Sequence, residues 1–172
     1  VATPGRFFDT LHVDTPLYRA VISEKGAAIT SFTLHHYRES IDNDSPDKEL
    51  VSIGNPLGTG FVHFSNVKTA HLPRAVFTTS FSENTLELSN APASISFFWH
   101  SPEGILVEKT FTFLPDSYEI KMDVNLTNTS VTPFTGAFQV SLVDTIPSNQ
   151  RQFSFQGPFV YVNGNLEEID ID

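Results

Sequence analysis

Alternating apolar and polar residues mark the centre of this chain. From position 118 to position 126 every second residue is apolar, and the residues between them are polar or charged. The apolar set is Tyr118, Ile120, Met122, Val124 and Leu126. A period of two predicts a β-strand with one buried face and one exposed face.

The residues just before this run show the same alternation. Val107, Phe111 and Phe113 are spaced by two, with Glu108, Thr110 and Thr112 between them, and Lys109 interrupts the apolar set. Leu114-Pro115-Asp116-Ser117 separates the two runs. Proline beside aspartate is typical of a tight turn, so the pattern predicts a β-hairpin.

Further short strands separated by turn-forming residues are predicted along the rest of the chain. The ranges are 15–22, 28–37, 49–53, 61–64, 75–81, 85–88, 93–100, 159–162 and 166–169, with one more strand carrying Phe134, Phe138, Val140 and Leu142 on one face. Residues 1–14 show no clear period, and Asn163-Gly164 is a strong hairpin signal. No window predicts an amphipathic helix. The pattern favours one all-β domain spanning residues 1–172, a sandwich or a barrel with little or no helix.

The overall charge limits the classes of molecule that the protein is expected to bind. Ten basic residues against twenty acidic ones give a net charge of −10, which repels phosphate backbones and anionic lipid headgroups. Nucleic acid is therefore not expected as a partner. The chain has no cysteine, and its sixteen phenylalanines favour a densely packed core.

No stretch of the sequence predicts a membrane span or a signal peptide. No apolar run approaches the roughly 20 residues that cross a bilayer, and the chain opens Val1-Ala2-Thr3-Pro4. Because it starts without methionine and stops on Ile171-Asp172, we interpret it as a piece of a longer polypeptide.

Candidate catalytic and metal-binding residues are not apparent in the pattern. His35 and His36 are neighbours in a predicted strand and point to opposite faces, so they cannot share a metal ion. Asp116, Glu119 and Asp123 fall on turns or exposed faces, where a paired acid and base are not expected. We therefore assign no catalytic residue, no metal ligand and no cofactor, and the binding residues stay unknown.

Several segments resemble the large periplasmic domain of the YidC/Oxa family of bacterial membrane-protein insertases. The matching segments are 15–37, 48–51, 104–128, 155–158 and 167–170. The first opens with Thr15-Pro16-Leu17-Tyr18 and ends with Ser31-Phe32-Thr33-Leu34-His35-His36-Tyr37. The third contains Glu108-Lys109-Thr110-Phe111-Thr112-Phe113 and Asp116-Ser117-Tyr118. They follow the family's order and cover most of the chain, whereas the loops at 38–47 and 54–74 carry little of the resemblance.

The resemblance implies a twisted two-sheet β-supersandwich of the galactose mutarotase type, held on the periplasmic side of the inner membrane. It implies an N-terminal anchor helix before the domain and, after it, the helical core that inserts proteins, so that the full-length parent is a multi-pass membrane protein. The expected role is accessory and non-catalytic: contact with Sec translocon components or with nascent periplasmic segments. The chain stops before the segment that links the sandwich to the next membrane helix in the family.

Two alternatives remain open from the sequence. The same fold type includes mutarotase-like sugar enzymes, which would need histidine and glutamate side chains converging on a pocket. The second alternative is a non-catalytic sandwich that binds carbohydrate or peptide. Phe97 and Trp99 lie on one face of a predicted strand and could line its groove. Core packing is the competing explanation for this pair.

Overall fold

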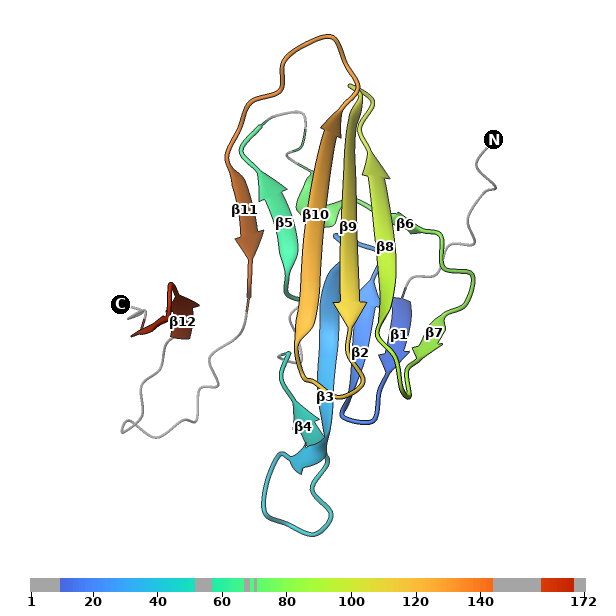
Figure 1. Ribbon diagram of the computed structural model, residues 1–172, viewed down its shortest axis with the longest axis vertical. Coiled ribbons are helices and arrows are strands. Elements are labelled where there is room, and N and C mark those ends of the chain that lie inside the picture. The colour runs from blue at the N-terminus through green and yellow to red at the C-terminus, as the bar shows by residue number, and fades with distance from the viewer. Residues whose placement is uncertain (1–9, 52–56, 67–68, 70, 144–158, 169–172) are drawn as a thin grey trace.

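Two facing β-sheets form the body of the protein (Figure 1). The computed structural model describes residues 10–51, 57–66, 69, 71–143 and 159–168. The first sheet has the strand order β4-β3-β2-β1-β7. Its strands are β1 (Thr10–Asp14), β2 (Tyr18–Ser23), β3 (Ala28–Arg38), β4 (Asp47–Glu49) and β7 (Thr85–Glu87). The β1–β7 pair is parallel, and the other pairs of this sheet are antiparallel.

The second sheet contains the predicted central hairpin. Its order is β10-β9-β8-β6, with β6 (Thr78–Thr79), β8 (Ala93–His100), β9 (Ile105–Phe113) and β10 (Ile120–Asn128). Met122 of β10 is paired with Phe111 of β9, which is paired with Ile95 of β8. The strand prediction around residues 93–126 and the all-β sandwich prediction are thus confirmed.

Two separate two-stranded ladders and a short 3₁₀ helix complete the described structure. One ladder joins β5 (Phe61–Phe64) to β11 (Phe138–Ser141), and the other joins β12 (Phe159–Val162) to β13 (Asn165–Glu168). The 3₁₀ helix η2 covers Leu72–Arg74. Asn163 and Gly164 both have positive φ angles, 52° and 86°, as a two-residue hairpin turn of this kind requires.

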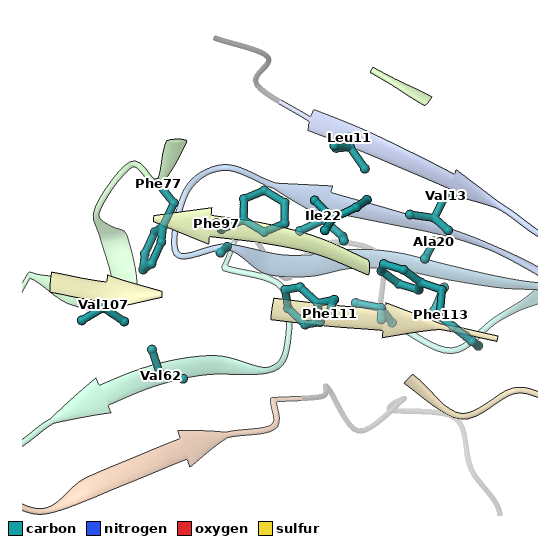
Figure 2. Packing of buried hydrophobic residues seen from close by; sticks show 14 of the residues in the cluster. Leu11, Val13, Ala20, Ile22, Val62, Phe77, Phe97, Val107, Phe111 and Phe113 are labelled. Carbon is teal, nitrogen blue, oxygen red and sulfur yellow. The ribbon is translucent and has the colours of Figure 1, made fainter. Parts of the chain in front are cut away.

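The hydrophobic core lies between the two sheets, and aromatic rings fill much of it (Figure 2). Phe111 packs edge-on against Phe97, with ring centroids 6.1 Å apart at 83°, and lies 6.3 Å from the ring of Phe113. On the opposite sheet Tyr18 is fully buried and stacks on Phe32 at 4.7 Å. The phenylalanine-rich composition therefore serves the core, as the sequence indicated.

Several strand predictions need correction. Of the strand expected over 75–81, only Thr78–Thr79 forms a strand, β6. Residues 10–14, which showed no period, form β1, because Leu11 and Val13 are buried between β2 and β7, and two apolar residues are too few to reveal a period. The strand expected over 15–22 begins only at Tyr18, since Thr15 caps a turn by bonding the Tyr18 backbone. The strand expected over 49–53 lies earlier, at Asp47–Glu49; residues 52 and 53 of that prediction fall outside the described residues.

The carboxylate of Glu49 explains the shift of β4. It accepts hydrogen bonds from the Ser31 hydroxyl at 2.5 Å, the Phe32 backbone N–H at 2.7 Å and the Val51 backbone N–H at 2.9 Å. The side chain thereby takes the place of a backbone acceptor beside β3 and fixes the register of β4, the edge strand next to β3. Burial raises the pKa of Glu49, but these hydrogen bonds, led by that from Ser31, outweigh it and hold the pKa below its usual value.

Replacing Glu49 with glutamine is expected to lower the free energy of unfolding by about 1 kcal/mol at pH 7, since charge-assisted hydrogen bonds at a partly exposed site are lost. Because the pKa of Glu49 is lower in the folded state, its stabilising contribution is present above the unfolded-state pKa and disappears as the pH falls through the folded-state value. Urea unfolding at pH 7 and at pH 3 measures the effect, and the difference between the two proteins should shrink at pH 3. Glu119→Gln, at an exposed turn position, is the control; an equal loss in both variants would contradict the prediction.

Candidate interaction surface

The ladder of β5 and β11 presents large apolar side chains to solvent. Phe138 pairs with Phe64 and Val140 pairs with Val62. Val62 is buried in the core, and in Figure 2 it points from β5 toward the strand that carries Val107. Phe138 and Val140 are each 45% exposed, and Leu142, just beyond the strand, is 81% exposed. The ladder therefore extends the apolar surface of the core to an exposed rim, which is formed by Phe138, Val140 and Leu142.

A cluster of three aromatic rings holds the ladder in place. The ring of Phe64 lies 5.1 Å from that of Phe134 and 5.7 Å from that of Phe138. A Cβ atom on Gly136 would lie 2.8 Å from the Phe64 ring, so the segment before β11 passes directly against that ring. The predicted strand containing Phe134, Phe138, Val140 and Leu142 is thus confirmed in its central part only, and its apolar face is largely exposed.

The free edge of β11 differs in charge from the free edge of β10. Among the described residues β11 pairs only with β5, and β10 pairs only with β9. The edge strand β10 carries the exposed charged residues Lys121 and Asp123, which discourage pairing with another chain. The sequence of β11, Phe138-Gln139-Val140-Ser141, has no charge and no proline. Of these two edges, β11 is therefore the better template for an added strand.

A charged cluster that sequence reasoning missed lies on the first sheet. His35 is 3.2 Å from Asp14 and 3.8 Å from Asp47, and Arg19 contacts Asp14 at 2.5 Å. Partial burial raises the pKa of Asp14, but Arg19 and then His35 outweigh it and lower that pKa below its usual value. The cluster brings together a carboxylate and a histidine from strands that are distant in the sequence. All four side chains are at least 28% exposed on the sheet surface, so the cluster is a surface ion-pair network.

Among the described residues, the features expected of the sugar-binding alternatives do not come together. Phe97 is fully buried and Trp99 packs against the core, so this pair serves core packing and does not line a groove. One open hollow is lined by Phe81, Ser82, Glu83, Thr85, Leu86 and Glu87. Its lining has two carboxylates without the histidine that a mutarotase-like site would add.

Two kinds of feature are absent from the described residues. Within those ranges, no group of three or more histidine, cysteine, aspartate or glutamate side chains is arranged to hold a metal ion. In the same part of the chain, no helix is long and apolar enough to cross a membrane.

Comparison with known protein families identifies the family. The model of the YidC periplasmic domain matches residues 10–172 of this chain. The chain belongs to the YidC periplasmic domain family. Among curated relatives, the membrane protein insertase YidC of Syntrophus aciditrophicus is 30% identical over 161 residues, which is 90% of this chain and 29% of that protein.

Other YidC proteins give the same result. Those of Geobacter metallireducens and Pelobacter propionicus are 29% and 27% identical, and the matches cover 91% and 90% of this chain. The chain spans about three tenths of the length of these relatives, 29% in both cases.

The two longest segments that resemble the YidC domain lie in the two sheets of the sandwich. Residues 15–37 cover β2 and most of β3, and residues 104–128 cover β9 and β10. These segments supply buried residues of both sheets, such as Tyr18 and Phe111. The apolar residues of β11 lie outside the segments that resemble the family.

Proposed function

We propose that this chain is a single, non-catalytic accessory domain on the periplasmic side of the inner membrane, within a protein insertase of the YidC type. Its membership in the YidC periplasmic domain family supports this role. The core supports a single domain, since it joins residues from Leu11 in β1 to Phe113 in β9.

The observation that carries the proposed activity is the edge of β11, which is uncharged, pairs with no strand other than β5 among the described residues, and lies beside exposed Phe138 and Val140. An extended polypeptide that adds to this edge would satisfy its backbone groups with those of β11, while alternate side chains would contact the apolar rim. We propose extended segments of nascent membrane proteins as the ligand. Translocon components such as those of the Sec machinery are proposed partners through the same edge.

Site-specific photocrosslinking in the full-length insertase tests this activity. A photoreactive residue at Gln139 is expected to crosslink to an extended, translocating segment, whereas one at Lys121 on the charged edge of β10 is not. Introducing a charge by Val140→Lys should lower the Gln139 crosslinking yield about five- to tenfold. Thr127→Lys on β10 is the matched control and should leave the yield unchanged. Crosslinks confined to loop positions such as Asp42 would overturn the proposal.

A further inference from the structure

A lysine occupies the core face of the second sheet. Lys109 lies in β9 between Val107 and Phe111, and its neighbours across the sheet are Phe97 in β8 and Val124 in β10. Its solvent exposure is 0%. A buried ammonium group is costly unless its charge and its three N–H donors are compensated, so its surroundings need a specific explanation.

Backbone carbonyls from two turns surround the ammonium group. Lys109 Nζ donates to the carbonyl of Gly60 at 2.5 Å, to that of Gly26 at 3.4 Å and to that of Ala27. The ring of Phe111 lies 4.9 Å from Nζ and adds a cation–π contact. Three acceptors match the three N–H groups of an ammonium. A neutral amine has only two donors and would direct its lone pair at one carbonyl.

The compensation comes from dipoles rather than from an opposite charge. Within the described part of the chain, no carboxylate lies within ion-pair distance of Lys109; Glu24 is the buried acid of the adjacent β2–β3 turn, and Lys25 beside it is exposed. Burial lowers the pKa of Lys109 to about 7, and the carbonyl dipoles oppose this by favouring the charged form. The arrangement resembles the carbonyl coordination of a bound monovalent cation.

One of the two turns connects both sheets to the β5–β11 ladder. Thr59 exchanges two backbone hydrogen bonds with Ile29 of β3, at 2.8 and 3.0 Å. Gly60, which precedes β5, donates its N–H to the carbonyl of Ser141 at the end of β11, at 3.0 Å. Val143 donates its N–H to the Thr59 hydroxyl at 3.1 Å. Lys109 supplies the hydrogen bond from the second sheet to this junction.

We propose that the ammonium group of Lys109 is an internal cation that fixes the β5–β11 ladder against the sandwich. It does so by holding the turn at Gly60 and the turn at Gly26–Ala27 through their carbonyls. Removing the charge would leave three buried carbonyl groups without this donor and would release the junction at Gly60. The inference concerns the position of the ladder, and it stands independently of what the ladder binds.

Hydrogen exchange on the full-length protein tests the proposal with Lys109→Met, which keeps the length and volume of the side chain but removes the donors. Amides of β5 and β11 are expected to exchange about 10- to 100-fold faster. A buried polar group that loses its hydrogen bond shifts the equilibrium between the closed and open ladder by about that factor. Amides of β7, at the edge of the first sheet beyond β1, should change by less than about twofold. Equal acceleration in all strands, or no acceleration in β5 and β11, would overturn the proposal.

Chemical rescue separates charge from packing. The part of the Lys109 side chain beyond Cβ, which Lys109→Ala removes, corresponds to n-propylammonium. Adding n-propylammonium to Lys109→Ala should restore slow exchange in β5 and β11, whereas n-propanol at the same concentration should not. If Lys109→Ala does not fold alone, folding that requires n-propylammonium and does not occur with n-propanol supports the proposal. Equal rescue by both compounds, or no effect of n-propylammonium on a variant whose ladder exchanges rapidly, would contradict it.

Discussion

Replacing Phe111 with alanine is expected to lower the free energy of unfolding by about 3–5 kcal/mol. Phe111 is 1% exposed and contacts the rings of Phe97 and Phe113. Its ring also faces the ammonium group of Lys109. Truncation removes the buried ring and leaves a cavity that close-packed neighbours cannot fill completely. Urea unfolding, with the slope checked for two-state behaviour, measures the loss.

The matched control for Phe111 is Phe98→Ala. Phe98 lies on the neighbouring strand β8, but its side chain is on the outer face of the sheet and is only partly buried. Its loss should cost about 1–2 kcal/mol, since a smaller apolar area is removed from water and no cavity forms. A cost for Phe98→Ala equal to that for Phe111→Ala would show that the region between the sheets is not the main core.

Gly58→Ala is expected to cost about 2–5 kcal/mol, because backbone strain adds to a steric clash. Gly58 has φ of +69°, and a Cβ atom there would lie 2.4 Å from the carbonyl oxygen of Ile29. That oxygen accepts the Thr59 hydrogen bond. The new methyl group would therefore push apart the contact between β3 and the junction before β5. Thermal or urea unfolding measures the loss.

Gly60→Ala distinguishes the cost of backbone strain from the cost of the steric clash at Gly58. Gly60 has a nearly identical φ of +72°, but a Cβ atom there would meet nothing within 4 Å. Only the cost of the left-handed conformation remains, about 1–2 kcal/mol. Similar losses for the two alanine variants would mean that the close approach to Ile29 relaxes without cost.

The parts of the fold predicted well from the sequence are those fixed by local alternation. The strands at 93–100, 107–113 and 118–126 each place several apolar residues on one face. The last two pair as the predicted hairpin, and the first pairs with the second, a neighbour that was not predicted. Strand β1 escaped prediction because its stability comes from pairing with β2 and β7 and not from its own pattern. The displaced strand β4 depends on the side chain of Glu49 bonding to β3, a contact that no local pattern reveals.

The candidate site could be predicted only in fragments. Lys109 was visible as an interruption of an apolar face, but its acceptors are 49 to 83 positions away in the sequence. The apolar residues of β11 were recognised as one face of a strand, and the sequence alone could not indicate that this face is exposed. Exposure depends on what packs against a strand, and pairing of β11 with β5 places Phe138 and Val140 at the rim.

The long separation between β5 and β11 affects the order in which the protein folds. His63 and Gln139, which face each other in the ladder, are 76 positions apart, whereas the β8–β9 and β9–β10 hairpins close over short turns. Closing a longer loop costs more chain entropy, so the hairpins can form before the ladder does. During synthesis from the N-terminus, all four strands of the second sheet are made after β5 and before its partner β11. During that interval Val62 and Phe64 are available to other chains, so the ladder closes after the second sheet and is exposed to mispairing during synthesis.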